Sequence, residues 1–333
     1  MHFLQPAVPA LPAGLVLTGK TIIVTGATSG IGLEICRQLL ARKVSTLIMA
    51  VRNTAKGETV RQSLLSEAGA RVANPNATVR VMQLDTEQYD SVQRFANAFR
   101  AEFQDLHALI ANAGIGTPNK ELASSGHEKN IQVNYLSNVL LTLALLPTLE
   151  ATGARSGEPT RVSWTCSRMI EHSSMAKKAT ALQPGEGVLA HFANINGVAT
   201  LSRYADSKLL GALFQRELAN HYSTKDVIIN SYCPGHVDTP MGNDLPLVVR
   251  MISNLVKAIR ARTVDQGGWI ALNAALLAGP ETHGKMLSDT VLEEPWSFIT
   301  SPEGRNVQRK LWNETIDEMA AWMTLPAWMT KLA

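Results

Sequence analysis

Cysteine is scarce in this sequence of 333 residues, which contains only three and no CxxC pair. Because Cys36, Cys166 and Cys233 lie far apart, the sequence argues against a disulfide scaffold and against a structural zinc site. This cysteine usage suits a reducing compartment. We therefore expect a cytoplasmic protein without a bound metal.

The sequence also has no large excess of positive or negative charge. It contains 31 Lys and Arg residues and 28 Asp and Glu residues, which gives a net charge of +3. This balance is too even to indicate a nucleic-acid partner or a membrane-surface partner. Hydrophobic residues make up 45% of the chain and charged residues 18%, which excludes a disordered protein. The length allows a large buried core.

Long apolar runs are absent as well. The longest apolar stretch, residues 136–149, is interrupted by Asn138, Thr142 and Pro147 and is shorter than the roughly 20 residues that a spanning helix needs. The first residues lack the basic and apolar regions of a secretory signal. We expect a soluble protein whose proline-rich residues 1–17 form an irregular arm.

Short β-branched segments alternate with longer helical patterns along the chain. The expected strands cover residues 21–24, 46–49, 79–82, 108–111, 161–164 and 227–230. The expected helices between them include residues 31–42, 91–103, 130–149, 204–222 and 264–277. This alternation predicts an α/β fold with a doubly wound parallel sheet and helices on both faces. One domain, residues 18–333, accounts for the remaining length.

A glycine-rich turn, Thr25–Gly32, follows the first strand and opens the first helix. Glycine allows the positive φ of a tight turn, and a helix N-terminus offers unpaired N–H groups to a pyrophosphate. The candidate ligands of this phosphate site are Gly26, Thr28, Ser29, Gly30, Ile31 and Gly32. A tight turn without a ligand is the alternative, which the position after the first strand disfavours.

The second strand ends in Arg52 and Asn53, with no acidic residue that would bind a ribose 2′-hydroxyl. An arginine at this place accommodates a 2′-phosphate, so the sequence predicts NADP(H) as the cofactor. A solvated surface arginine is the alternative. Asp85 and Thr86 follow the third strand, where Asp85 would bind the adenine amino group or cap the next helix.

Five motifs in this order resemble the short-chain dehydrogenase/reductase family over nearly the whole chain. They are Thr25–Gly32, Asn112-Ala113-Gly114, Asn134 with the strand-end Ser167, Tyr204-Ala205-Asp206-Ser207-Lys208, and Pro234-Gly235-His236-Val237-Asp238-Thr239. The region after Gly284 resembles retinol-dehydrogenase-like members, among which fungal proteins are the most similar, a hint of specialised metabolism. The resemblance implies a single Rossmann-type domain with a seven-stranded sheet.

The resemblance also implies the chemistry. Tyr204 and Lys208 are four residues apart and share a helix face; alone, such a pair is typical of an exposed surface. In the family the tyrosine protonates a carbonyl as the cofactor delivers hydride, with Ser167 orienting the carbonyl and Lys208 binding the ribose. Asn134 would hold a water in a proton relay. We expect Lys208 and an oxidised nicotinamide to lower the pKa of Tyr204.

Further cofactor contacts follow from the resemblance. They fall on Asn112, Ala113, Gly114, Pro234, Gly235, Val237 and Thr239. The Val237 backbone would bind the nicotinamide carboxamide, and Thr239 would reach the phosphates. Cys166 is interpreted as a packing residue at the end of a strand rather than as a reactive thiol.

Two segments exceed what the repeating unit needs. They are an insertion at residues 168–200 and an expected substrate lid at residues 239–262. Candidate substrate contacts are Met169, His191, Phe192, Met241, Leu245 and Met251, with ordinary core packing as the alternative for each. In monomeric carbonyl reductases such an insertion covers the dimer face, so we expect a monomer.

We therefore expect an NADP(H)-dependent reductase of a lipophilic ketone or aldehyde. The alternatives are a non-redox family member, such as an epimerase, dehydratase or cyclase, and a non-catalytic NADP-sensing protein. Such sensors typically lose the tyrosine or the lysine, and this chain has both. The apolar stripe of Trp312, Met319, Trp322 and Met323 predicts a helix docked on the body, with peripheral membrane association as the alternative.

Overall fold

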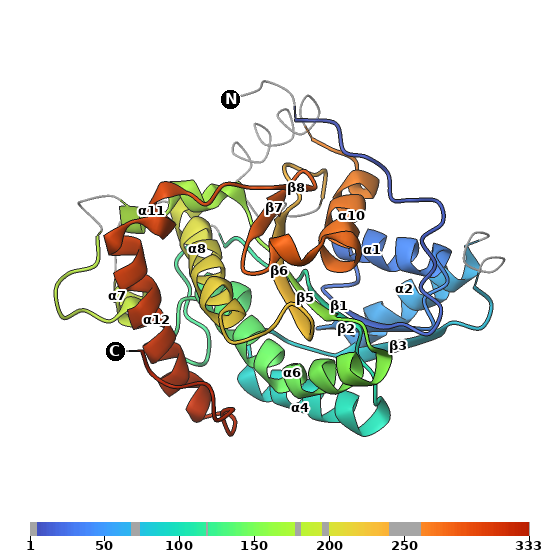
Figure 1. The fold of residues 1–333 in the computed structure, drawn as a ribbon, viewed down its shortest axis with the longest axis horizontal. Coiled ribbons are helices and arrows are strands. Elements are labelled where there is room, and N and C mark those ends of the chain that lie inside the picture. Colours follow the sequence, from blue (N-terminus) through green and yellow to red (C-terminus); the bar gives the residue numbers. More distant parts are fainter. Residues whose placement is uncertain are drawn as a thin grey trace.

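The computed structural model describes residues 5–67, 74–117, 119–176, 181–194, 200–239 and 261–332. They form a sheet in the order β3-β2-β1-β4-β5-β6-β7-β8, with helices on both faces (Figure 1). The strands are β1 Thr21–Thr25, β2 Thr46–Val51, β3 Thr78–Gln83, β4 Ala108–Ala111, β5 Thr160–Thr165, β6 Val227–Cys233, β7 Met286–Ser288 and β8 Val291–Leu292.

The helices include α-helical, 3₁₀ and π segments. The α-helices are α1 Gly30–Ala41, α2 Thr54–Ser66, α4 Tyr89–Glu102, α5 Lys129–Ile131, α6 Ser137–Ser156, α7 Val188–Asn194, α8 Thr200–Ala219, α10 Val264–Leu272, α11 Ser297–Thr300 and α12 Pro302–Ala320. The π segments are η1 Gln132–Leu136 and η5 Asn273–Leu277, and the 3₁₀ segments are η2 Arg168–His172, η3 Ser174–Ala176 and η6 Pro280–Thr282.

The α/β class and the parallel, doubly wound sheet are confirmed, but the predicted strand count of seven is one too low. All neighbours from β3 to β7 pair in parallel, and β8 pairs antiparallel with β7. A two-residue turn, Asp289-Thr290, joins them. Both turn residues have positive φ, 56° and 70°, as in a type I′ hairpin. An exposed strand of two residues carries no apolar alternation by which the sequence would reveal it.

Parallel strands place their carboxyl ends at one edge of the sheet, which is where this fold builds a site. The chain crosses from β1 to β2 on one side and from β3 back to β4 on the other, so β1 and β4 lie next to each other at the point where the strand order reverses. A crevice forms at such a reversal. The central strand is fully buried, since Ile22, Ile23 and Val24 are all 0% exposed.

Two apolar cores sandwich the sheet. Helices α1, α2 and α10 cover one face, and α4, α6, α8 and α12 contribute to the core on the other (Figure 1). The described part of the N-terminal arm, residues 5–17, contains no helix or strand. Its side chains Val8, Leu11 and Leu17 are nonetheless buried in the first of these cores. The arm is therefore docked along its length.

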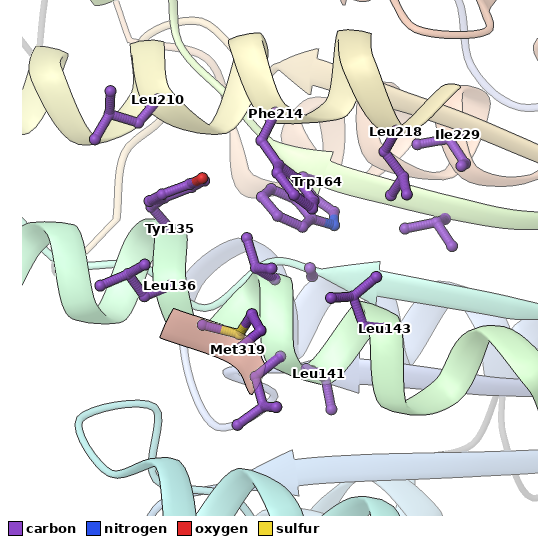
Figure 2. Packing of buried hydrophobic residues seen from close by; sticks show 14 of the residues in the cluster. Tyr135, Leu136, Leu141, Leu143, Trp164, Leu210, Phe214, Leu218, Ile229 and Met319 are labelled. Carbon is purple, nitrogen blue, oxygen red and sulfur yellow. The ribbon is translucent and has the colours of Figure 1, made fainter. Parts of the chain in front are cut away.

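The packing of α8 decides where its polar residues lie. Phe214 of α8 contacts Trp164 of β5 and Tyr135 of η1, with ring centroids 6.1 and 5.9 Å apart, respectively (Figure 2). On its other side Phe214 stacks on Trp312 of α12 at 5.4 Å. Trp312 and Met319 are 1% and 0% exposed, so the predicted docking of this helix on the body is confirmed.

One described helix, Lys129–Ser156, is long and apolar enough to cross a membrane. It extends beyond the apolar stretch expected from the sequence because α5, η1 and α6 run on without a break. Its most apolar stretch of 18 residues is 78% buried inside the protein. The helix is therefore a core element of this fold.

Candidate active site

The glycine-rich turn leaves β1 in a conformation that only glycine adopts readily. Gly26 and Gly30 have φ of 67° and 53°, in the left-handed region. A Cβ on Gly32 would collide with the carbonyl oxygen of Gly26. The turn therefore folds tightly enough to bring α1 against the end of β1.

The N-terminus of α1 is open to an anion. Ser29 is the N-cap, and in the described part of the chain no side chain caps this helix. The first turn carries no acidic residue. Its unpaired N–H groups and the positive end of the helix dipole therefore favour a phosphate. Thr28 and Ser29 add partly or fully exposed hydroxyls beside it.

The segment after β4 is tied to this turn. Asn112 Nδ2 donates to the carbonyl oxygen of Thr25 at 3.0 Å, and the amide of Ala113 donates to Thr25 Oγ1 at 2.9 Å. A Cβ on Gly26 would lie 3.1 Å from Ala113 Cα. Asn112 thus supports the turn with its side chain. The glycine-rich turn and the segment Asn112–Gly114, both predicted to bind the cofactor, therefore lie side by side.

Arg52 lies at the surface after β2 with 71% of its side chain exposed. Its Nη1 is 3.0 Å from Glu87 Oε1, and Glu87 Oε2 is 3.1 Å from Lys129 Nζ. No sequence pattern predicted this pairing. Lys129 Nζ also lies 3.3 Å from Glu121 Oε2. Two cations and two carboxylates therefore gather near the ends of β2 and β3, where the fold binds the adenosine half of a dinucleotide.

The residues beside Arg52 have local roles. Asn53 caps α2 by accepting from Lys56 N at 2.9 Å. Asp85 does not cap the following helix as one alternative proposed, because the N-cap of α4 is Gln88. Instead Asp85 Oδ1 accepts from the amide of Glu87 at 3.0 Å. Asp85 therefore shapes the turn that presents Glu87 to Arg52.

Four predicted catalytic residues converge at the carboxyl ends of β4 and β5. Asn134 Nδ2 donates to Ser207 Oγ of α8 and to Ile115 O, both at 2.9 Å, and its Oδ1 accepts from Ile115 N at 2.9 Å. A Cβ on Gly114 would lie 3.0 Å from Asn134 Oδ1 and 3.3 Å from Lys208 Nζ. Asn134 lies in the π-helical η1, a local irregularity that often marks functional positions.

Lys208 is buried behind Tyr204. Its Nζ donates to the carbonyl oxygen of Thr165 at 2.8 Å and lies 5.7 Å from the centroid of the Tyr204 ring. Burial lowers the pKa of Lys208 to about 8. The amine therefore loses its positive charge only slightly above neutral pH.

The pKa of Tyr204 is raised by burial in this structure, and a hydrogen bond with Ser167 offsets only part of the rise. The sequence led us to expect the opposite direction, from the combined charge of Lys208 and an oxidised nicotinamide. The difference arises because burial has the largest effect on this pKa, and the buried Cys233 and Cys166 raise it further. The phenol is therefore held in its protonated form.

A small cavity lies beside the Lys208 amine. Its volume is about 10 Å³, and its lining residues are Asn134, Trp164, Thr165, Cys166, Lys208, Gly211, Ala212 and Gln215. A space of this size holds about one water when polar partners line it. Cys166 contributes a buried thiol whose pKa is raised by burial to about 11, so it packs rather than reacts.

The start of the insertion is fastened to the catalytic helix. Ser167 Oγ accepts from Met169 N at 3.1 Å and opens η2. Asp206, between Tyr204 and Lys208 on α8, accepts from Ser173 Oγ, Ser174 N and Ser174 Oγ at 2.7, 2.7 and 2.8 Å. Asp206 is fully buried. Sequence reasoning included it in the motif but assigned it no role.

The segment after β6 bends at Gly235, which has a φ of 72°. Val237 is 7% exposed and forms a parallel bridge with Arg262. Pro234 O accepts from Arg262 Nη1 at 3.3 Å. The predicted nicotinamide segment, from Pro234 to Thr239, is thus held by Arg262 at Pro234 and at Val237.

The predicted substrate contacts divide into three groups. Met169 is partly buried two residues after Ser167. His191 and Phe192 are buried on α7, where Phe192 joins the main core and His191 Nδ1 is 2.9 Å from Glu186 Oε2. Met241, Leu245 and Met251 lie outside the described residues, as does nearly all of the expected lid at residues 239–262.

Comparisons with known proteins identify the family. A sequence profile described as short chain dehydrogenase matches residues 20–168. The short chain dehydrogenase macD of Penicillium terrestre is 49% identical over 327 residues, which cover 98% of this chain and 99% of that protein. The short chain dehydrogenase yanD of Aspergillus niger is 50% identical over 326 residues, covering 98% of each.

The chain belongs to the short-chain dehydrogenase/reductase family. It is therefore an oxidoreductase of the class that uses a nicotinamide cofactor, and its relatives include fungal proteins aligned over almost their full length. Among solved structures, NADPH-bound carbonyl reductase from chicken fatty liver matches with a TM-score of 0.59 and 20% identity, covering 83% of this chain and 99% of that one. This likeness supports the short-chain dehydrogenase/reductase fold.

Proposed function

We propose that this short-chain dehydrogenase/reductase reduces a ketone or aldehyde of a lipophilic small molecule with NADPH. The observation that carries the proposal is the convergence of Asn134, Tyr204 and Lys208. Asn134 is hydrogen-bonded to Ser207 of α8, Gly114 lies close to both Asn134 and Lys208, and the Lys208 amine lies near the Tyr204 ring. Because non-catalytic family members typically lose the tyrosine or the lysine, the partly buried Tyr204 beside the buried Lys208 argues against a sensor.

The residues present fit a dinucleotide. The turn at Gly26 and Gly30 and the uncapped start of α1, all within the described residues, offer N–H groups to a pyrophosphate. Arg52 and Lys129 supply positive charge for a 2′-phosphate, so NADP(H) is proposed over NAD(H). The Pro234–Val237 segment would then contact the nicotinamide end.

When bound, the nicotinamide supplies the hydride. Tyr204 holds the proton that the carbonyl oxygen takes up, and the raised pKa of its phenol keeps that proton in place at neutral pH. Ser167, which shares a hydrogen bond with Tyr204, orients the same oxygen. These two hydroxyls perform general acid catalysis and positioning.

Lys208 and Asn134 serve the return of the proton. The cavity that they line has room for about one water, which would serve as one link of a relay that returns a proton to Tyr204. The Lys208 amine, protonated below its pKa of about 8, would bind ribose hydroxyls and stabilise a transient phenolate. This division of roles makes Tyr204 the acid and Lys208 its electrostatic support.

Further parts of the proposal concern the surroundings. We propose a specialised metabolite as the substrate, supported by the fungal relatives. A monomer is supported by α12, which packs on α8, and by α7, which packs on α12. A cytoplasmic location is supported by the three cysteines, each described, buried and outside any disulfide.

NADPH oxidation against a panel of lipophilic ketones and aldehydes tests the proposal. Turnover of at least one carbonyl compound, with the matching alcohol recovered in an amount equal to the NADPH oxidised, supports it. Conversion of a candidate substrate without net oxidation of NADPH would refute it in favour of epimerisation, dehydration or cyclisation. Binding of NADPH without conversion of any compound, including isolated pathway intermediates, would favour a sensor.

A further inference from the structure

Two arginines meet one buried carboxylate beside the segment that follows β6. Asp289 and Arg262 are 6% and 5% exposed, and Arg262 Nη1 is paired with Asp289 Oδ1. The second carboxylate oxygen of Asp289 accepts from Arg168 Nη2 at 2.7 Å. Arg168 Nε also pairs with Glu293 Oε2 at 3.2 Å. The network therefore balances two positive and two negative charges.

Each arginine also reaches a part of the candidate active site. Arg168 directly follows Ser167, and its amide donates to Cys233 Sγ at the end of β6, at 3.3 Å. Arg262 donates through Nη1 to Pro234 O at 3.3 Å, and its amide donates to His236 O at 2.8 Å. Asp289 is therefore the common partner of Arg168, which follows the catalytic serine, and of Arg262, which hydrogen-bonds to the nicotinamide segment.

The N-terminal arm completes this arrangement. Gln5 Nε2 donates to His236 O, and the amide of His236 donates to Gln5 Oε1, both at 2.8 Å. Arg262 Nη2 donates to Pro6 O at 2.6 Å. A Cβ on Gly235 would collide with the Gln5 amide. The arm thus lies directly on the bend of the nicotinamide segment.

Asp289 lies in the strained two-residue turn between β7 and β8. Asp289 and Thr290 have φ of 56° and 70°. A β-branched residue at positive φ is a genuine outlier, and such strain persists only where surrounding contacts stabilise it. Here the strained turn directs the Asp289 carboxylate inward, where both of its oxygens are bound.

We propose that Asp289 is a positioning residue that, through Arg168 and Arg262, fixes the Pro234–Val237 segment relative to Ser167. Gln5 clamps the same segment from the arm. The inference rests on the proposed function, in which this segment contacts the nicotinamide and Ser167 contacts the carbonyl. We call this arrangement of Asp289, Arg168, Arg262 and Gln5 the clamp. Because a misplacement of about 1 Å between reacting groups can slow a reaction about a hundredfold, the clamp would affect the rate of hydride transfer.

Hydrogen exchange of the protein alone tests the clamp without any cofactor. Asp289→Asn removes the charge and keeps a residue type that tolerates positive φ. Amides at residues 235–238 should exchange about two- to thirtyfold faster, the range of coupling along such networks, and Gln5→Ala should accelerate exchange at His236. Thr290→Gly, which relieves the strain, should leave this exchange unchanged. Unaltered exchange in Asp289→Asn would overturn the inference.

Binding and kinetics test the functional consequence. Asp289→Asn should raise the NADPH Kd and lower kcat, each by about two- to thirtyfold, with a larger isotope effect from NADPH deuterated at the transferred position. Arg262→Met should also weaken NADPH binding and lower kcat, and Arg262→Lys, which keeps the positive charge, should show smaller losses of both. Arg161→Gln is the matched control, since Arg161 donates to Ala278 O at 2.5 Å near the opposite end of β5 and should change stability alone.

The outcomes separate this inference from the proposed function. A wild-type protein that binds no NADPH refutes the proposed function, and the exchange experiment still decides whether the clamp exists. A wild type that binds and turns over normally, with an Asp289→Asn variant equal to it in Kd, kcat and isotope effect, overturns the clamp and leaves the proposed function intact.

Discussion

Replacing Glu87 by glutamine should tighten NADPH binding and leave NADH binding almost unchanged. Glu87 Oε1 lies 3.0 Å from Arg52 Nη1, so the arginine proposed for the 2′-phosphate is already paired with a carboxylate. The second oxygen of Glu87 holds Lys129 at 3.1 Å. A bound 2′-phosphate must therefore compete with Glu87 for both cations.

The size of the effect follows from the exposure of the pair. A charge-assisted hydrogen bond from Arg52 to a phosphate contributes about 1.5–3 kcal/mol. A largely exposed ion pair such as Arg52–Glu87 contributes only about 0.2–1 kcal/mol. The net preference for NADPH that remains is about 0.5–2.8 kcal/mol, or about two- to hundredfold in Kd. Releasing Arg52 should therefore improve NADPH affinity by up to about fivefold.

Titration of both cofactors into the wild type, Glu87→Gln and Arg52→Gln provides the assay. Arg52→Gln should weaken NADPH about two- to hundredfold and NADH hardly at all, and its effect should shrink as salt is raised. Equal losses for both cofactors in Arg52→Gln would refute the 2′-phosphate role. A Glu87→Gln variant with weaker NADPH binding would refute the competition.

Three further predictions concern the catalytic end and its scaffold. Because burial lowers the pKa of Lys208 to about 8, kcat/KM for NADPH should be flat below that pH and fall above it as the amine loses its proton; a rate still rising at pH 9 would contradict this assignment. Gly32→Ala, whose Cβ would meet the Gly26 carbonyl, should lower the free energy of unfolding by about 1–3 kcal/mol in urea titrations and weaken cofactor binding; an unchanged midpoint would argue against the tight turn. Asp206→Ala leaves Ser174 donors without their buried acceptor and should cost about 1–3 kcal/mol of stability, whereas a loss below about 0.5 kcal/mol would show that the insertion is not anchored there.

Local rules explain what could be predicted from the sequence. The first strand, the glycine-rich turn and the start of α1 are close in the chain, so their spacing alone specifies a phosphate-binding turn. The four-residue spacing of Tyr204 and Lys208 likewise needs only a helix to place both on one face. These features follow from backbone geometry within a few residues.

The remainder depends on contacts that the sequence does not reveal. Gln5 and His236 are separated by 231 positions, and no local pattern links an irregular arm to a loop after β6. The direction of the Lys208 amine, toward Thr165 O, depends on how α8 packs against β5. The raised pKa of Tyr204 in the protein alone follows from burial, an effect that reasoning from the charges of Lys208 and the cofactor left out.

The central claim is that Tyr204 donates the proton in an NADPH-dependent carbonyl reduction. Single-turnover oxidation of bound NADPH, measured in the wild type and in Tyr204→Phe with the same carbonyl compound, tests it most directly. The account predicts an unchanged NADPH Kd and a hydride-transfer rate lowered by about 10²- to 10⁴-fold. A Tyr204→Phe variant that transfers hydride within about threefold of the wild-type rate would contradict it.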